Sequence, residues 1–281
     1  MAPADQSLPV TFVASDMDGT LLTPERVIHP VTADVVRRAA DAGVTVVVAT
    51  GRNHWSAAEL LVDAGLDDGS VPYALCSNGA TLFDVPAGEV IERTSLPGDE
   101  LAEFVAALDR HVPGVVYAWE TAESRFDSPA FRAAREATVP EEDNPWPVGE
   151  VDIAVAEVVK LLVGHVELIA TDLLDALVDH IPATVSASTS GASFIEVTHS
   201  SANKGAAVEA LCRRLGVDQA ATAAFGDHTN DLEMLRWVGR GYVMANAHPR
   251  AFDASPLRAP HHAEHGVAQI IADLAGVAYP G

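Results

Sequence analysis

The alternation of short apolar strands with helical segments constrains the fold of this chain more than any other feature. The continuous β-branched run VTVVVAT, residues 44–50, is typical of a strand buried on both faces of a parallel sheet. A helix is expected before it over residues 29–43, and a strand over residues 10–15. Residues 54–65 and 73–80 continue the pattern with a helix and a strand. Strand, helix and strand within about 40 residues predict a βαβ unit.

The same alternation returns near the C-terminus. Residues 203–216 have helical spacing and end at a glycine, and residues 221–227 form a strand of small residues. A short helix, a strand and a last helix are expected after them, over residues 231–239, 241–246 and 266–276. We therefore expect an α/β fold whose core is a Rossmann-like, doubly wound parallel sheet.

The middle of the chain has a different pattern. Turn signals such as VPAG and HVPG separate five candidate strands: EVIERT, GVVYAWE, VVKLLVG, TVSAS and SFIEVT. Helices are expected near residues 98–111 and 171–180. This α+β character predicts an inserted cap domain over residues 85–199, so that residues 1–84 and 200–281 form the core domain.

The charge of the chain restricts its partners. Lys and Arg total 17 against 40 Asp and Glu, and the formal net charge is −23. Such a surface repels nucleic acid and anionic lipid, so neither is an expected partner. The acidic run PEEDN, residues 140–144, is interpreted as a solvated loop. We expect a monomer or a weak homodimer.

The location is predicted from absent signals and from the cysteines. No apolar run approaches the roughly 20 residues that a membrane-spanning helix needs. The N-terminal residues lack the basic and apolar regions of a signal peptide. The two cysteines, Cys76 and Cys212, lie in apolar segments, which is typical of reduced, buried thiols. These features predict a cytoplasmic protein.

Two aspartates two positions apart follow the first predicted strand. Asp16 and Asp18 tend to project to the same side as the strand ends. In open α/β sheets, ligands bind at this carboxyl edge. Two carboxylates there repel each other unless a cation binds them or their pKa values are driven apart. A plain turn is the alternative interpretation, because Asp-Gly pairs are common in loops.

Two further strand ends carry polar residues. In ATGR, the hydroxyl of Thr50 and the amides that follow it can donate to an anion, and a plain strand-to-turn connection is the alternative. Asp227, Asn230 and Asp231 follow the strand over residues 221–227. Acidic residues at such a position also serve as ordinary helix caps, and this alternative is stronger for Asp231 than for Asp227.

Lysine is scarce in this chain, which contains Lys160 and Lys204 alone. Lys204 lies in the first turn of a predicted helix, where a cation faces the positive end of the helix dipole at a cost of about 0.3–1 kcal/mol. An anion in front of it would turn this penalty into attraction, so the position points to a site; a surface lysine is the alternative. Replacement of Lys160 by Arg, in the predicted cap strand VVKLLVG, is expected to be nearly silent.

Together these residues resemble the haloacid dehalogenase-like phosphatases. Four motifs stand in the order of that family: Asp16-Met17-Asp18-Gly19-Thr20, Thr50-Gly51-Arg52, Lys204-Gly205, and Gly226-Asp227 with Asn230-Asp231. CSNGA, FIEVT before NKG, and NDLEML are similar to the Cof-type subgroup with a type IIB cap. The resemblance covers nearly the whole chain and is weakest over residues 97–157.

The resemblance implies a magnesium-dependent phosphatase that forms an aspartyl-phosphate. Asp16 would be the nucleophile and Asp18 the general acid and base, and Lys204 is the third catalytic residue. The implied metal-site residues are Asp16, Asp18 through its backbone carbonyl, Asp227, and Asp231 through a bound water or by orienting Lys204. The implied phosphate-binding residues are Thr50, Gly51, Lys204 and Asn230.

Several positions depart from the family pattern. His228 stands where the family usually has a small residue, and HHAEHG, residues 261–266, replaces a more acidic loop. The side chains of this loop, His261, His262 and His265, are expected to line or flank the mouth of the pocket rather than to bind a transition metal. His228 and Arg52 are candidate substrate contacts, and Arg52 is equally able to pair with a core carboxylate.

The leading interpretation is a phosphatase that acts on a small soluble phosphomonoester, with a sugar phosphate as one candidate. A phosphomutase is the close rival and needs a longer-lived aspartyl-phosphate. A non-catalytic sensor of phosphometabolites would not require both Asp16 and Asp18. A receiver-type phosphoacceptor also uses an acidic pocket and a lysine, but the two-aspartate signature and the large insert disfavour it.

Overall fold

The computed structural model describes residues 8–121, 123–136, 146–149, 152–153, 156–190 and 192–281. The chain divides into two compact units, here named the core unit, Met1–Glu92 with Asn203–Gly281, and the inserted unit, Arg93–Ala202. The acidic run over residues 140–144 lies outside the described residues. Within the described parts, no helix has the length and apolar character to cross a membrane.

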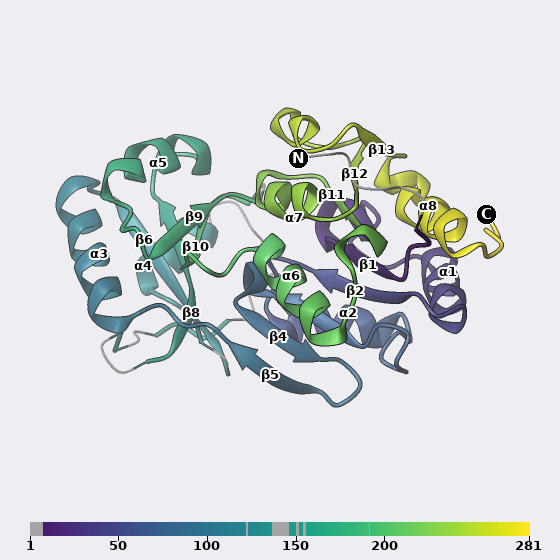
Figure 1. Ribbon diagram of the computed structural model, residues 1–281. Coiled ribbons are helices and arrows are strands. Elements are labelled where there is room, and N and C mark those ends of the chain that lie inside the picture. Colours follow the sequence, from purple (N-terminus) through teal and green to yellow (C-terminus); the bar gives the residue numbers. More distant parts are fainter. Residues whose placement is uncertain (1–7, 122, 137–145, 150–151, 154–155, 191) are drawn as a thin grey trace. The chain divides into compact units, whose positions relative to one another are not determined.

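The core unit is built on an eight-stranded sheet with the order β13-β12-β11-β1-β2-β3-β4-β5 (Figure 1). Its six parallel strands are β13 (Leu257–Ala259), β12 (Arg240–Met244), β11 (Thr222–Gly226), β1 (Phe12–Ser15), β2 (Thr45–Ala49) and β3 (Tyr73–Cys76). The chain builds outward from β1 in both directions, so the strand order reverses there. This arrangement confirms the parallel α/β core predicted from the sequence, and it places a switch point at the carboxyl end of β1.

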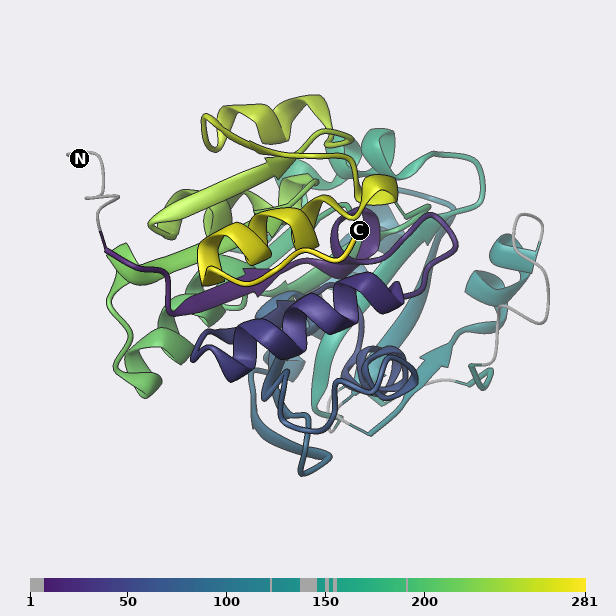
Figure 2. The same ribbon diagram turned by 90° about the vertical axis from the view of Figure 1, so that its right-hand side faces the viewer.

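Helices cover both faces of this sheet because successive strand residues point to opposite sides. In β1, Val13 packs in one cluster with α1 (Pro30–Asp41), α2 (His54–Asp63) and α8 (Gly266–Ala275). Phe12 and Ala14 pack in another cluster with α6 (Lys204–Leu215) and α7 (Leu232–Trp237). Figure 2 shows α1 and α8 side by side on the first face. The sheet is therefore doubly wound.

The two remaining strands form a hairpin at the edge of the core sheet. β4 (Thr81–Asp84) runs antiparallel to β3, and β5 (Glu89–Arg93) lies next to β4. The sequence placed the strand EVIERT in the insert, but it belongs to the core sheet. The reason is that the VPAG segment between the two strands is a hairpin turn, with Gly88 at φ +69°, and not a domain boundary.

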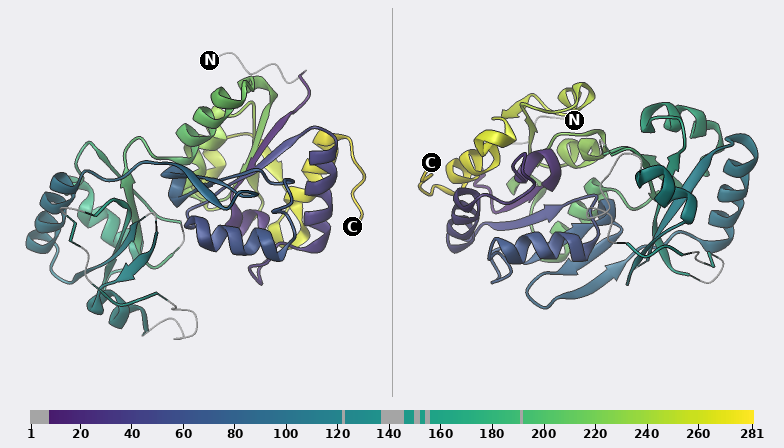
Figure 3. Two further views of the ribbon diagram at one scale, coloured as in Figure 1. Left: turned by 90° about the horizontal axis from the view of Figure 1, so that it is seen from below. Right: turned by 180° about the vertical axis from the view of Figure 1, so that it is seen from behind.

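The inserted unit has an antiparallel sheet with the order β7-β6-β8-β10-β9. Its strands are β6 (Val115–Thr121), β7 (Arg125–Asp127), β8 (Val158–His165), β9 (Val185–Ser188) and β10 (Ile195–His199). One apolar cluster joins this sheet to α3 (Gly98–His111) and α5 (Ala170–Leu177), and another joins it to α4 (Pro129–Glu136) through Phe131. Figure 3 shows the ribbon of this unit from two further sides. The unit has the α+β character expected for the insert.

Lys160 lies within the sheet of the inserted unit. It is 3 % exposed, and its Nζ lies 3.1 Å from Oε1 of Glu196 and 3.4 Å from Oε2 of Glu120. These carboxylates come from β10 and β6, the strands on either side of β8. A larger guanidinium does not fit such a position without rearrangement. We therefore expect Lys160→Arg to lower stability, in contrast to the nearly silent replacement expected from the sequence.

Candidate active site

Asp16 follows the last residue of β1 at the switch point of the core sheet. Its backbone N–H still donates to the carbonyl oxygen of Phe225 in β11, at 3.0 Å. The chain then turns over Met17–Leu21, where the backbone of Asp18 and Gly19 is not helical and Gly19 has φ +76°. A Cβ at Gly19 would come within 2.5 Å of Oδ2 of Asp227, so only glycine allows this close approach. The parallel pairing of β1 with β11 places Asp16 and Asp227 at the same edge of the sheet, and the turn packs Gly19 against Asp227.

Lys204 is the first residue of α6, and its side chain is completely buried. Its Nζ donates to Oδ1 of Asp16 and to Oδ1 of Asp231, each at 2.6 Å. Burial disfavours the charged ammonium, but the attraction of the two carboxylates outweighs it and raises the pKa of Lys204 above its ordinary value. The cation therefore stays charged at the positive end of the helix dipole because two anions face it.

Asp231 organises the chain that follows β11. Its Oδ2 accepts hydrogen bonds from the backbone N–H groups of Asp227 and His228, both at 2.9 Å. Its other carboxylate oxygen accepts from Lys204. Asp231 therefore satisfies backbone donors where a helix begins and also faces the lysine, so the two interpretations of this residue do not exclude each other.

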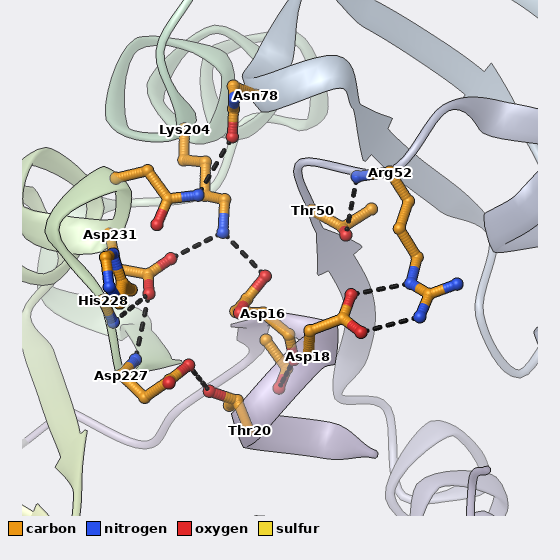
Figure 4. A network of polar contacts seen from close by, with 12 residues as sticks. Asp16, Asp18, Thr20, Thr50, Arg52, Asn78, Lys204, Asp227, His228 and Asp231 are labelled. Atoms are coloured by element: carbon orange, nitrogen blue, oxygen red, sulfur yellow. Dashed lines mark hydrogen bonds and ion pairs between the residues drawn. The ribbon is translucent and has the colours of Figure 1, made fainter. Parts of the chain in front are cut away.

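The three aspartates form an acidic cluster, shown in Figure 4. One carboxylate oxygen from each of Asp16, Asp227 and Asp231 lies within 4.8 Å of the others. Burial raises the pKa of Asp16 well above its ordinary value, Lys204 lowers it in part, and the two other aspartates raise it again. Burial and the charge of Asp231 raise the pKa of Asp227 to about 6, although Thr20 donates to its Oδ1 at 2.8 Å. Three carboxylates against one ammonium leave excess negative charge.

The donor set of this cluster fits Mg²⁺. Magnesium prefers oxygen ligands and commonly uses only one or two carboxylates, with water in its other positions. A divalent cation would also offset the burial and the mutual repulsion that raise the pKa values of Asp16 and Asp227. Within the part of the chain that the structure describes, this cluster is the group of acidic and metal-ligating side chains close enough together to hold a metal ion.

Asp18 points away from the cluster and pairs with Arg52. Nε of Arg52 donates to Oδ2 of Asp18 and Nη2 donates to Oδ1, both at 2.6 Å (Figure 4). The Asp18 side chain is 44 % exposed, and Nε of Arg26 lies 4.0 Å from its Oδ1. Of the two interpretations of Arg52, pairing with a core carboxylate is therefore the one that this structure contains.

Thr50 and Gly51 follow β2 at the same edge of the sheet as Asp16, because β2 pairs in parallel with β1 and places Val48 opposite Ser15. Thr50 is buried, and its Oγ1 accepts from the backbone N–H of Arg52 at 3.1 Å. Its backbone N–H donates to the carbonyl oxygen of Leu75. The hydroxyl hydrogen of Thr50 is thereby left to donate to an anion.

Asn78 and Asn246 take part in the site, although neither had a role predicted from the sequence. Oδ1 of Asn78 accepts a hydrogen bond from Nδ2 of Asn230 at 3.0 Å. Nδ2 of Asn246 donates to the carbonyl oxygen of Gly19 at 2.7 Å, and its Oδ1 accepts from the backbone N–H of His262 at 3.1 Å. The sequence could have identified Asn246 as a site residue, because it follows the parallel strand β12 at the edge of the sheet where Asp16 and Asp227 lie.

Several histidines lie in pairs, with their rings close to one another. The ring of His228 lies 5.1 Å from that of His248 between centroids, and the ring of His265 stacks on that of His29 at 4.1 Å. Nδ1 of His262 lies 2.8 Å from the carbonyl oxygen of Leu22. His261 lies beside His262, with ring centroids 4.8 Å apart. These contacts connect the loop over residues 261–266 to the segment after the first motif.

The comparisons with known proteins agree with this geometry. The family model of the haloacid dehalogenase-like hydrolases matches residues 13–271. The YxeH protein of Bacillus subtilis (strain 168) is 32 % identical over 272 residues, which cover 94 % of this chain and 97 % of that protein. The HMP-PP phosphatase of Serratia proteamaculans (strain 568) is 33 % identical over 250 residues, 85 % of each chain.

Solved structures share the fold. A phosphatase of this superfamily from Bacteroides thetaiotaomicron, BT1666, superposes with a TM-score of 0.79 at 21 % identity and covers 96 % of this chain and 97 % of its own. The subclass IIB sugar phosphatase BT4131 superposes with a TM-score of 0.78 at 21 % identity, with 94 % and 98 % covered. The resemblance seen in the sequence is thus confirmed. The chain belongs to the haloacid dehalogenase-like hydrolases and is a phosphatase of the Cof-type group.

Proposed function

We propose that this protein hydrolyses a small-molecule phosphomonoester with Mg²⁺ as cofactor and Asp16 as the nucleophile. The proposal rests on one observation, the fully buried ammonium of Lys204 held between Asp16 and Asp231 with Asp227 beside them. A lysine that only stabilised the fold would not need three carboxylates around it. The excess negative charge of this cluster is unfavourable in a buried position, and a bound cation would offset it. We also propose that the protein acts in the cytoplasm as a monomer or weak homodimer, and that the inserted unit, Arg93–Ala202, serves as a cap.

The metal would be held by the carboxylates of Asp16 and Asp227 and by the backbone carbonyl of Asp18. Asp231 would support these ligands without binding the metal directly. Bound there, Mg²⁺ supplies positive charge against the phosphoryl oxygens and keeps Asp16 ionised. Asp231 already accepts three hydrogen bonds, from Lys204 and two backbone N–H groups. Its proposed part is therefore to orient Lys204 and the backbone of Asp227.

Asp16 attacks phosphorus through a carboxylate oxygen, and the bond between phosphorus and the leaving oxygen breaks. Lys204 holds the attacking carboxylate through Oδ1 and so limits its rotation. The ammonium also neutralises part of the charge that spreads over the phosphoryl oxygens. The product of this step is an aspartyl-phosphate on Asp16.

Asp18 donates a proton to the leaving oxygen and then takes one from the water that hydrolyses the aspartyl-phosphate. In this structure both of its carboxylate oxygens accept from Arg52. One oxygen must leave Arg52 to reach the leaving group. Arg52 is therefore proposed to hold Asp18 between turnovers, and its partly exposed position also makes it a candidate substrate contact together with His228.

The phosphoryl oxygens are proposed to bind the hydroxyl of Thr50, the backbone N–H of Gly51, the ammonium of Lys204 and the amide of Asn230. Backbone and hydroxyl donors recognise a phosphoryl group without regard to the rest of the substrate. Substrate choice is therefore expected to depend on other residues. Relatives carry the names HMP-PP phosphatase and sugar phosphatase, so HMP-PP and sugar phosphates are the first substrates to test.

Phosphate release from a panel of small phosphoesters is expected to stop when a chelator removes divalent cations. Added Mg²⁺ should restore it, and Ca²⁺ should be a poor replacement because it accepts looser coordination with more ligands. A loss of at least about a hundredfold is expected, since the charge of the metal offsets that of the phosphoryl group. Full activity in excess chelator would contradict the metal assignment.

The stabilisation of the protein by Mg²⁺ is expected to depend on pH. The pKa of Asp227 is raised from 3.8 to about 6, so ionisation of this group weakens the metal-free fold as the pH rises between these values. Mg²⁺ binds the ionised carboxylates, so its effect on Tm should be largest above about pH 6 and should fade below it, where protons compete. Thermal melts with and without Mg²⁺ at about pH 5 and pH 8 measure this. Asp227→Asn should reduce the dependence of the Mg²⁺ effect on pH, and equal shifts at both pH values in the parent protein would contradict the prediction.

A phosphomutase would share all of these residues and differ in the lifetime of the aspartyl-phosphate. Transfer of phosphate between two positions of a sugar without release of inorganic phosphate would identify it. A sensor would bind phosphometabolites and release no phosphate. The presence of both Asp16 and Asp18 favours hydrolysis over sensing.

A further inference from the structure

The turn between β3 and β4 has an unusual backbone. Ser77, Asn78 and Gly79 follow one another with positive φ angles of 50°, 58° and 92°. The left-handed region is unfavourable for serine and is tolerated by asparagine. Such a conformation persists when the surroundings enforce it, and it is found preferentially at functional sites.

The backbone of the turn holds the loop after β2. The N–H of Ser77 donates to the carbonyl oxygen of Arg52 at 2.7 Å, and the N–H of Asn78 donates to that of Thr50 at 2.9 Å. Two successive N–H groups thus reach the two ends of the Thr50–Arg52 loop. The left-handed conformation is what turns both groups toward this loop rather than into the ladder of the sheet.

The same turn packs against the start of α6. A Cβ at Gly79 would lie 2.8 Å from the carbonyl oxygen of Asn203 and 2.8 Å from Cβ of Ala207. Asn203 is the N-cap of α6, and Lys204 follows it. Only glycine permits this contact, so the turn supports the helix end that carries the lysine.

The side chain of Asn78 reaches the fourth motif. It is 4 % exposed, and its Oδ1 accepts the hydrogen bond from Nδ2 of Asn230 (Figure 4). The two remaining amide atoms, Nδ2 of Asn78 and Oδ1 of Asn230, are buried and have no hydrogen-bond partner among the described residues. The bond between the two side chains is therefore what fixes the direction of the Asn230 amide.

We propose that Asn78 is a positioning residue for phosphoryl binding, which it serves by orienting the amide of Asn230 while its backbone holds the Thr50–Arg52 loop. The inference rests on the proposed function, in which Asn230 and Thr50 contact phosphoryl oxygens. A ligand oxygen at Asn230 would be met by an amide whose orientation is already set. This reduces the ordering that binding would otherwise require.

Asn78→Gly separates the two parts of this role. Glycine adopts the left-handed conformation readily, so the backbone hydrogen bonds to Thr50 and Arg52 remain, and only the contact with Asn230 is lost. We expect kcat/KM to fall about tenfold, as for the loss of one oriented hydrogen bond, and Tm to fall by a few degrees because the same bond is lost from the folded protein. A kcat/KM within twofold of the parent would overturn the inference.

A double-mutant cycle tests whether Asn78 acts through Asn230. Asn230→Ala should lower kcat/KM at least as much as Asn78→Gly, and the double variant should be no worse than Asn230→Ala alone. Additive losses would mean that Asn78 acts independently of Asn230 and would overturn the proposal. Asn53→Ala is the control: Asn53 caps α2 through the N–H of Ser56 at 3.0 Å, so its loss should lower Tm and leave kcat/KM unchanged.

Vanadate binding separates this inference from the proposed function. Isothermal titration of orthovanadate in the presence of Mg²⁺ measures phosphoryl-site affinity without turnover. We expect a Kd about tenfold higher in Asn78→Gly than in the parent. If the parent binds vanadate but releases no phosphate from any ester, the proposed function fails and a weaker Kd in the variant still supports the role of Asn78. An unchanged Kd, or no vanadate binding by the parent, overturns it.

Discussion

Asp16→Asn is expected to lower phosphate release by at least about 10⁴-fold, because an amide is a poor nucleophile and a weaker metal ligand. The fold should survive. Burial disfavours the ionised form of Asp16, and Lys204 keeps Asp231 as a partner in the variant. Steady-state phosphate release and a thermal melt measure the two effects separately.

Asp34→Asn is a suitable control for this substitution. Asp34 lies on α1 and makes a partly exposed ion pair with Arg38, so its replacement should change neither turnover nor Tm appreciably. Turnover of Asp16→Asn within tenfold of the parent, with an unchanged control, would remove the covalent mechanism.

Lys204→Arg is expected to lower turnover by about a hundredfold or more although the charge is kept. The ammonium is compact and meets two carboxylates at 2.6 Å, whereas the guanidinium is a planar fork that needs more room. It would push the carboxylate of Asp16 away from its position for attack. Displacements of about 1 Å can lower rates on the order of a hundredfold. Phosphate release at saturating substrate is the measurement.

Lys160→Arg is the matched control for Lys204→Arg. The sequence indicated a nearly silent replacement, whereas the structure predicts a loss of stability. Lys160 is also buried between two carboxylates, but it belongs to the inserted unit. Both substitutions should therefore lower Tm, whereas only Lys204→Arg should lower turnover about a hundredfold or more in the fraction that remains folded. Equal losses of activity per folded molecule would show that Lys204 has no special part in the chemistry.

The core of the fold could be predicted because buried parallel strands require apolar residues at every position. The run over residues 44–50 is such a case and corresponds to β2. The position of β5 could not be predicted in this way. Its partner β4 is the short segment TLFD, which has no clear strand pattern, so the hairpin that joins the two strands looked like the start of the insert.

The candidate site could be predicted as far as motif spacing allows, and the partners of its side chains could not. Asp18 pairs with Arg52 from 34 positions away, and Asn78 pairs with Asn230 from 152 positions away. Such contacts depend on how loops from different strands meet. The strand predicted over residues 73–80 ends at Cys76, and the Asn-Gly pair that follows is a turn signal that could have placed its end.

The burial of both lysines makes amine chemistry a probe of folding in this protein. Lys204 is not exposed and Lys160 is 3 % exposed, so an acylating reagent should reach neither ε-amine while the fold is intact, and surface positive charge comes from arginine. Each unit contains one of the two lysines. Acylation found at Lys160 would report opening of the inserted unit, and acylation at Lys204 would report opening of the core unit. Peptide mass mapping could thus follow the two units separately in the unaltered protein.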